Sequence, residues 1–180
     1  SCRVKAIETA SRIELPSKLS INFMPNAIYE PETCLAKTLS TARKTGFDKK
    51  NIIFEVTEQE KVVSQDFLVD VFEAYRKEGF MTAIDDFGAG HSGLNLLSDF
   101  QPDIIKIDMK LIRDIDSNKV NQVLVKGILD IAEQLGIRII AEGIETENEF
   151  KYLQDAGVSL MQGYFFQKPM LEAIQPVVFR

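Results

Sequence analysis

Short apolar runs alternate along the chain with longer stretches of helical periodicity, and this alternation restricts the fold more than any other feature. Strict alternation of strand and helix indicates a parallel sheet, because a parallel neighbour is reached through a crossover. The runs are apolar on both faces, as buried parallel strands are. We predict strands over Leu19–Phe23, Ile52–Thr57, Met81–Asp86, Ile104–Asp108, Arg138–Ile144 and Leu160–Phe166.

The stretches between these strands carry helix signals. Glycine follows several of them, as it often does at helix C-termini. Thr146 and Glu149 form a capping box at the start of the last helix, which ends at Gly157. We predict the other helices from Pro31 to Gly46 and over Ser64–Glu78, Leu94–Asp99 and Val120–Leu135.

Two architectures fit this order of elements, a doubly wound open sheet and a (β/α)8 barrel. A barrel takes about 250 residues, and the chain has 180. A barrel therefore needs one or two further units upstream. The first residues, Ser-Cys-Arg-Val-Lys, have the pattern of a helix interior. We expect one domain over residues 1–180, incomplete at its N-terminus.

Composition narrows the class of ligand. Lys and Arg number 21 against 27 Asp and Glu, a net charge of −6 without a basic run. This balance excludes the electrostatic footprint of a protein that binds duplex DNA or an anionic membrane. No apolar run approaches the roughly 20 residues of a membrane span. The two cysteines form no motif, so we expect a reduced, cytoplasmic setting.

Polar residues stand at the ends of nearly all predicted strands. In parallel sheets this edge faces the functional site. Several carboxylates converging there would raise one another's pKa, and bound Mg²⁺ or Mn²⁺ would remove the repulsion. Each residue alone also has a structural interpretation as a turn, cap or ion-pair residue. The residues are Asn22, Glu55, Glu58, Asp85, Asp86, Lys106, Asp108, Glu142, Glu145 and Gln162. Because Asp85 and Asp86 are adjacent, we expect their side chains to diverge.

The segment from Gly88 to Gly93 satisfies the G-x-G-x-x-G pattern of dinucleotide-cofactor domains. Asp108 ends a predicted strand 20 residues after Gly88, where such domains place a ribose-binding acid. Two features oppose this interpretation. The carboxylates of Asp85 and Asp86, just before the loop, would repel a pyrophosphate. The pattern normally follows the first strand of such a domain, whereas two predicted strands precede it here. We therefore favour a glycine-rich lid over a site. His91 in this loop is either an exposed residue or a pH-sensitive element of the lid.

Five strings, in order, resemble the EAL domain family of cyclic-di-GMP phosphodiesterases across essentially all 180 residues. They are Phe54-Glu-Val-Thr-Glu58, Asp85-Asp-Phe-Gly-Ala-Gly90, Pro102-Asp-Ile-Ile-Lys-Ile-Asp108, Ala141-Glu-Gly-Ile-Glu145 and Gln162-Gly-Tyr-Phe-Phe-Gln-Lys-Pro169. The resemblance implies an α/β fold, a TIM-like (β/α) barrel of the EAL type. The family's signature Glu-Ala-Leu strand is absent here, and we expect it upstream of Ser1.

The resemblance also implies an activity: hydrolysis of cyclic-di-GMP to linear pGpG with two divalent ions, Mg²⁺ or Mn²⁺. The alternative is an inactive EAL domain that acts as a cyclic-di-GMP receptor or protein-interaction module. The implied partners are a second copy of the chain, docked near the Asp86 loop and the Lys106 strand, and an upstream sensory or GGDEF module.

Roles follow by motif. The resemblance assigns metal ligation to Asn22, Glu55, Asp85, Asp86 and Glu142, and catalysis to Lys106, Glu142 and Gln162. It assigns the lid and its anchor to Glu58, Phe87, Gly88 and Gly90, and substrate contacts to Asp108, Glu145 and Pro169.

Overall fold

The computed structural model describes residues 2–24, 31–58, 65–90 and 92–174. Its strands belong to one six-stranded sheet and follow one another in chain order, β1 to β6. The β1–β2, β4–β5 and β5–β6 pairs are parallel. A doubly wound sheet would reverse its strand order at a switch point. An unbroken chain order is that of a (β/α) barrel, which confirms the predicted fold class.

The chain divides into two compact units. The first comprises residues 1–56, 60–83 and 170–174, and the second comprises residues 57–59, 84–169 and 175–180. Strand β3 (Met81–Phe87) begins in the first unit and ends in the second.

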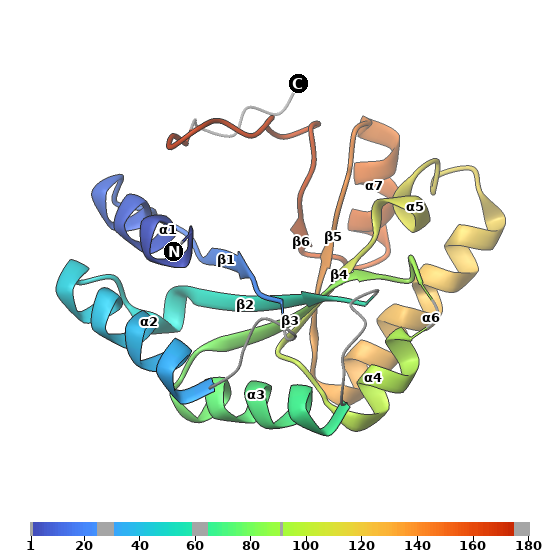
Figure 1. The fold of residues 1–180 in the computed structure, drawn as a ribbon. Coiled ribbons are helices and arrows are strands. Elements are labelled where there is room, and N and C mark those ends of the chain that lie inside the picture. The colour runs from blue at the N-terminus through green and yellow to red at the C-terminus, as the bar shows by residue number, and fades with distance from the viewer. Residues whose placement is uncertain (1, 25–30, 59–64, 91, 175–180) are drawn as a thin grey trace. The chain divides into compact units, whose positions relative to one another are not determined.

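Among its described residues, the first unit holds two parallel strands, the start of β3, three α-helices and one 3-10 turn. The helices α1 and α2 lie side by side (Figure 1). The core is aromatic: the rings of Phe23, Phe54, Phe72, Tyr75 and Phe80 contact one another, with centroids 4.4–6.3 Å apart. The elements are α1 (Cys2–Arg12), β1 (Leu19–Asn22), α2 (Pro31–Thr45), the 3-10 turn η2 (Lys49–Asn51), β2 (Ile52–Thr57) and α3 (Gln65–Lys77). Thr57, the last residue of β2, belongs to the second unit.

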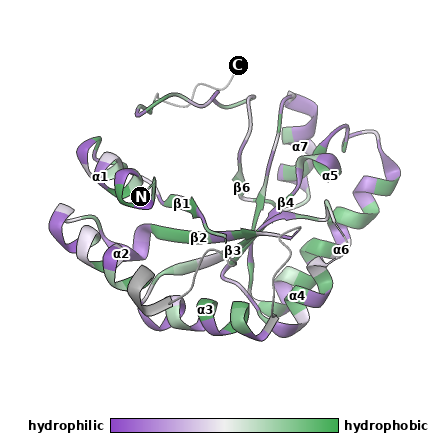
Figure 2. Cartoon of the chain, viewed as in Figure 1, coloured by the Kyte–Doolittle hydropathy of each residue, from purple (hydrophilic) through white to green (hydrophobic). Residues whose placement is uncertain are grey.

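The second unit holds the remaining strands, and its core is aliphatic. Ile107, Ile112, Ile115, Ala141, Ile144 and Leu153 are fully buried and pack into one cluster. Figure 2 shows the apolar colouring of β5, whereas α6 carries both hydrophilic and hydrophobic residues. The elements are α4 (Gly93–Asp99), β4 (Ile104–Ile107), α5 (Met109–Ile112), α6 (Lys119–Leu135), β5 (Arg138–Ala141), α7 (Glu147–Asp155) and β6 (Leu160–Met161).

Most predicted elements agree with the structure to within one or two residues, but the last two strands were predicted too long. β5 ends at Ala141 and β6 at Met161. After β6 the chain turns: the N–H of Phe165 donates to the carbonyl of Ile144 at 3.0 Å, and Phe150 stacks on Phe165. Aromatic residues that read as a strand therefore cover α7 instead. The short helix α5 was not predicted.

Candidate functional site

The centre of the candidate site in the second unit is a buried lysine between two carboxylates. Nζ of Lys106, near the end of β4, lies 2.9 Å from Oδ1 of Asp85 and 2.9 Å from Oε1 of Glu142. The side chains are exposed by 7%, 12% and 14%. Asp85 stands in β3, and Glu142 directly follows β5. Three neighbouring segments of the unit thus bring one cation and two acids to the same place, as the sequence predicted.

Asp86 joins this group through an unusual backbone conformation. Its φ is 54°, in the left-handed region that L-residues other than Asn and Asp rarely adopt. Adjacent residues of a regular strand point to opposite faces. Here one carboxylate oxygen each from Asp85, Asp86 and Glu142 lie within 4.8 Å of one another. The predicted divergence of Asp85 and Asp86 is wrong, because the local backbone turns both toward one point.

The electrostatics of the group follow from burial and an excess of acids. Burial raises the pKa of Glu142 to about 7, Lys106 lowers it in part, and Asp85 raises it further. Burial also raises the pKa of Asp86, followed by the charges of Asp85 and Asp108. A single lysine cannot neutralise four neighbouring carboxylates. The group therefore binds protons more tightly than isolated carboxylates do, and a divalent cation would compete with them.

The donor set suits a hard cation. Its ligand atoms are carboxylate oxygens. Mg²⁺ and Mn²⁺ prefer such oxygen ligands to the softer nitrogen and sulfur ligands. Two further predicted ligands, Asn22 and Glu55, lie in the first unit and are register partners in the β1–β2 pair. Glu55 is buried and Asn22 is exposed. These two residues therefore stand side by side on neighbouring strands.

Glu58 holds the glycine-rich loop. Its Oε2 accepts the N–H of Gly88 at 2.7 Å and of Gly90 at 3.3 Å. Its Oε1 accepts the N–H of Ser92 at 2.9 Å and of Gly93 at 2.7 Å. A dinucleotide-binding loop must offer these N–H groups to a pyrophosphate, but here a buried carboxylate occupies them. Glu58 therefore anchors the loop, and His91 lies outside the described residues.

The other predicted site residues differ in burial and in their contacts. Asp108 is buried and caps α5, accepting the N–H of Lys110 at 2.8 Å. Phe87 is buried, whereas Gln162 and Pro169 are exposed. Oε1 of Glu145 lies 2.8 Å from Nη2 of Arg113, so its carboxylate already has a cationic partner.

Sequence reasoning did not identify Arg113 or assign Glu149 any role beyond a helix cap. Nη1 of Arg113 lies 3.6 Å from Oε1 of Glu149, which is 1% exposed. The only sequence signal here was the capping box, and it does not indicate a contact to Arg113, which lies 36 positions earlier.

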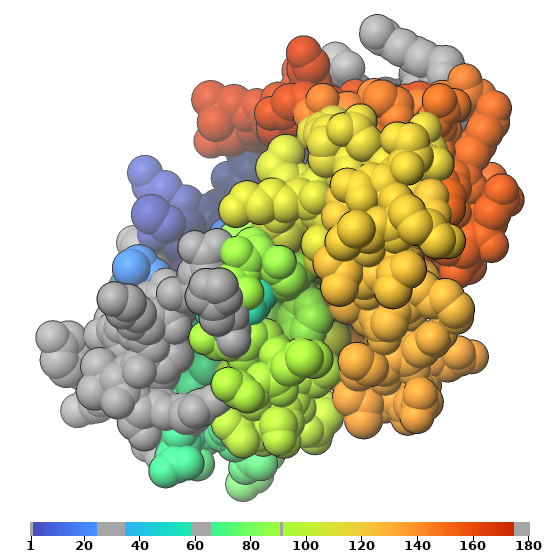
Figure 3. Space-filling view, turned by 90° about the vertical axis from the view of Figure 1, so that its right-hand side faces the viewer, coloured from blue at the N-terminus to red at the C-terminus, as the bar shows by residue number. Residues whose placement is uncertain are grey.

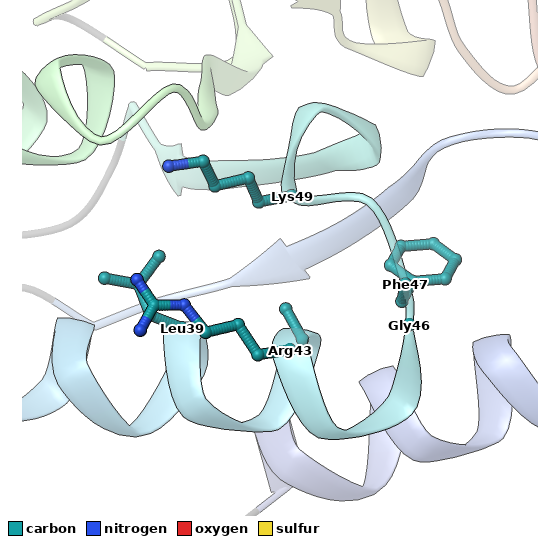
Figure 4. A pocket seen from close by; sticks show the side chains of 6 residues that line it. Leu39, Arg43, Gly46, Phe47 and Lys49 are labelled. Carbon is teal, nitrogen blue, oxygen red and sulfur yellow. The ribbon is translucent and has the colours of Figure 1, made fainter.

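A separate pocket of about 440 Å³ lies in the first unit, at the C-terminal end of α2 (Figure 4). Arg43 and Lys49 line it, together with apolar residues such as Leu39 and Phe47. Its charged groups are cations, so it offers no carboxylate to a metal ion. Among the described residues, no helix combines the length and apolar composition that crossing a bilayer requires.

Comparisons with known proteins place these observations in a family. The family model described as "EAL domain" matches residues 3–169. The chain is 34% identical over 164 residues to the probable cyclic di-GMP phosphodiesterase PdeG of Escherichia coli, covering 89% of this chain and 32% of that protein. It is 32% identical over 175 residues to the blue light- and temperature-regulated antirepressor BluF of the same species, covering 97% and 43%. The chain thus spans less than half the length of these two relatives.

Solved structures of EAL proteins resemble this chain in fold and in sequence. A standalone versatile EAL protein from Vibrio cholerae O395 in its c-di-GMP bound form superposes with a TM-score of 0.94 at 51% identity, covering 98% of this chain and 75% of that one. The manganese/cy-diGMP complex of Klebsiella pneumoniae BlrP1 at pH 6 has a TM-score of 0.91 at 37% identity, covering 99% and 46%. The buried acids, the order of the strands and the matched family model lead to one conclusion: the chain belongs to the EAL domain family.

Proposed function

We propose that this EAL domain is a metal-dependent phosphodiesterase that hydrolyses cyclic-di-GMP to linear pGpG. The observation that carries the proposal is Lys106 between Asp85 and Glu142, with Asp86 in reach of the same point. A buried cation beside buried acids is costly to fold, and we take its presence as support for a catalytic site. Several curated relatives are named cyclic di-GMP phosphodiesterases.

Asp85, Asp86 and Glu142 would hold Mg²⁺ or Mn²⁺, and we assign Asn22 and Glu55 to the same ligand set by family resemblance. By the same resemblance, the family's signature glutamate would complete that set, and the proposed activity is conditional on it. Two bound divalent ions supply an activated water and neutralise charge on the phosphate.

The protein's own residues position the reactants. Lys106 presents a fixed cation where negative charge develops, which stabilises the transition state without reorganisation. We also assign Glu142 to accept or return a proton of the attacking water. We assign Gln162 to the same water, Asp108, Glu145 and Pro169 to the nucleotide, and the loop held by Glu58 to closure over it.

A second candidate function is that of a cyclic-di-GMP receptor or protein-interaction module. The observation that favours it is BluF, named an antirepressor, which matches 97% of the chain at 32% identity. A receptor would bind the nucleotide without cleaving it, and the metal ligands would be dispensable for binding.

The experiment that separates the two incubates the purified protein, including its upstream residues, with cyclic-di-GMP and Mn²⁺ or Mg²⁺, and resolves the products by chromatography. We expect pGpG to accumulate, and to be absent with Asp85→Asn and when the metal is chelated. Saturable binding of cyclic-di-GMP with no linear product would establish the receptor and refute the enzyme.

We also propose that the protein forms a homodimer. The resemblance implies contact near the Asp86 loop and the Lys106 strand, and α6 adds an exposed apolar face to the same unit. This helix buries Val125 and Ala132 on the sheet but exposes Val120, Val123, Leu124 and Leu135 along another face. Figure 3 shows α6 on an open side of the second unit. Apolar stripes of this kind mark interaction sites. Leu124→Glu is expected to convert a dimer into a monomer in light scattering, and an unchanged mass would contradict the proposal.

We further propose, from the family resemblance, a sensory or GGDEF module upstream and a cytoplasmic location.

A further inference from the structure

The carboxylate of Glu149 joins two loops that are far apart in the sequence. Its Oε2 accepts the N–H of Glu145 at 2.9 Å and of Thr146 at 3.1 Å, in the segment that connects β5 to α7. Its Oε1 accepts the N–H of Asp114 at 3.1 Å, in the segment that connects α5 to α6. Only the bond to Thr146 belongs to the capping box. The remaining contacts require another explanation.

Arg113 reinforces the same junction from the α5 side. Its Nη1 lies 3.6 Å from Oε1 of Glu149, and its Nη2 lies 2.8 Å from Oε1 of Glu145. Burial alone would raise the pKa of Glu149. Backbone N–H donors and the charge of Arg113 outweigh burial, so the pKa lies below its ordinary value. The carboxylate is therefore ionised at neutral pH, and a negative charge that is 1% exposed depends on these partners.

One joined segment leads directly to a proposed metal ligand, and the other leads to α5, which packs against the loops that follow two of the ligands. The β5–α7 segment starts at Glu142. The next residue, Gly143, has a φ of 72°, and a Cβ placed on it would lie 2.4 Å from Cβ of Met109 in α5. Gly88, in the loop that follows Asp86, lies close to another residue of α5. A Cβ on Gly88 would lie 2.5 Å from Cδ1 of Leu111. The short helix α5 is thus packed between the loop that follows Glu142 and the loop that follows Asp86.

We propose that Glu149, together with Arg113, is a positioning residue for metal binding. By holding α5 against the β5–α7 segment, it keeps α5 in the place where Met109 and Leu111 set the backbones of the Glu142 and Asp86 loops. Partners outside the ligand shell commonly fix ligand orientation in this way. The inference rests on the proposed metal-dependent function.

Glu149→Gln tests this role selectively. A glutamine can still complete the capping box. If its carbonyl oxygen serves Glu145 and Thr146, its NH₂ group faces the N–H of Asp114, and two donors meet. The measurement is Mn²⁺ titration by calorimetry without nucleotide, beside thermal unfolding. We expect the Mn²⁺ affinity to fall about 10- to 100-fold, and hydrolysis to recover when Mn²⁺ is raised to saturation.

The matched control is Glu147→Gln. Glu147 lies in the first turn of the same helix, is exposed, and pairs only with Lys151 at 2.7 Å among the described contacts. Its Mn²⁺ affinity should equal that of the wild type. If Glu149→Gln lowers the melting temperature but leaves the Mn²⁺ affinity unchanged, Glu149 is merely structural and the inference is wrong.

Arg113→Gln provides a second arm if Glu149→Gln does not fold, because Arg113 is one third exposed and its removal leaves the backbone donors in place. We expect a smaller loss of Mn²⁺ affinity, partly restored in Arg113→Lys. Unchanged affinity in Arg113→Gln would overturn the inference in that case. A wild type that binds no Mn²⁺ would instead refute the proposed function, so the two failures are distinguishable.

Discussion

Nζ of Lys106 lies 2.9 Å from Oε1 of Glu142, and yet the pKa of this glutamate is raised to about 7. The reason is that burial disfavours the carboxylate and that Asp85 shares the same lysine at the same distance. One cation cannot compensate two buried acids together with their neighbours. The group is therefore balanced only when a proton or a metal ion supplies the missing positive charge.

The first prediction is that metal binding releases a proton. Below pH 7 the ion must displace the proton of Glu142, so the apparent Mn²⁺ affinity should rise up to about tenfold per pH unit and level off above pH 7. Calorimetry at pH 6, in buffers with different ionisation enthalpies, should show about one proton released, and almost none at pH 8. Equal release by Glu142→Gln would show that another group titrates.

The same shift fixes the sign of a stability effect in the metal-free protein. The folded pKa of Glu142 is above its ordinary value of 4.5, so the folded state binds the proton more tightly than the unfolded chain. This stabilisation is fully present below about pH 4.5 and is lost as the pH rises through 7. Urea unfolding with chelator at pH 5 and pH 8 measures the loss, and saturating Mn²⁺ should remove it.

Removal of the lysine gives the second prediction. Lys106→Met leaves Asp85 and Glu142 buried without their shared cation. Loss of one partner of a buried ion pair typically lowers the free energy of unfolding by about 3–5 kcal/mol. The loss should be larger at pH 8 than at pH 5, because Glu142 is protonated and uncharged at pH 5. Hydrolysis of cyclic-di-GMP should fall by about 100-fold or more. Lys110→Met is the control, because Lys110 is exposed in α5, and it should retain wild-type turnover.

The third prediction concerns the glycine-rich loop that Glu58 anchors. Glu58→Gln replaces an acceptor of four N–H groups by a side chain that also donates, so at least one of these N–H groups loses its partner. We expect a loss of about 1–3 kcal/mol and faster hydrogen exchange at Gly88, Gly90, Ser92 and Gly93. Exposed Glu73 in α3 provides a matched Glu→Gln variant that should change neither. Unaltered exchange in Glu58→Gln would mean that the loop is held by other contacts.

A pair of glycines gives the fourth prediction. A Cβ on Gly163 would lie 2.1 Å from the carbonyl oxygen of Ile144, whereas a Cβ on Gly127 in α6 meets nothing within 4 Å. Gly163→Ala should therefore destabilise the protein by at least about 1–3 kcal/mol. Gly127→Ala should stabilise it by about 0.5–1 kcal/mol, because alanine favours a helix. Thermal unfolding of both variants checks the prediction, and similar melting temperatures would contradict it.

The positions of most elements could be predicted because their signals are local. The run Ile52–Thr57 is a strand with the predicted bounds, and the capping box of Thr146 and Glu149 starts α7 where expected. The strands over Arg138–Ile144 and Leu160–Phe166 were predicted too long, because apolar residues that cover α7 have the same composition as a buried strand. The four residues of α5 are too few to show helical periodicity.

The sequence by itself determined the fold class, the family and the acids that stand at strand ends, because βα alternation and motif order are written along the chain. The tertiary structure alone decided how these acids meet. The left-handed backbone of Asp86 turns two adjacent carboxylates together, Lys106 is shared by acids from two other segments, and Glu149 bonds to Asp114. Each of these depends on residues 20 or more positions apart, or on a backbone angle that no local pattern specifies. Such contacts exist only after packing has brought the segments together.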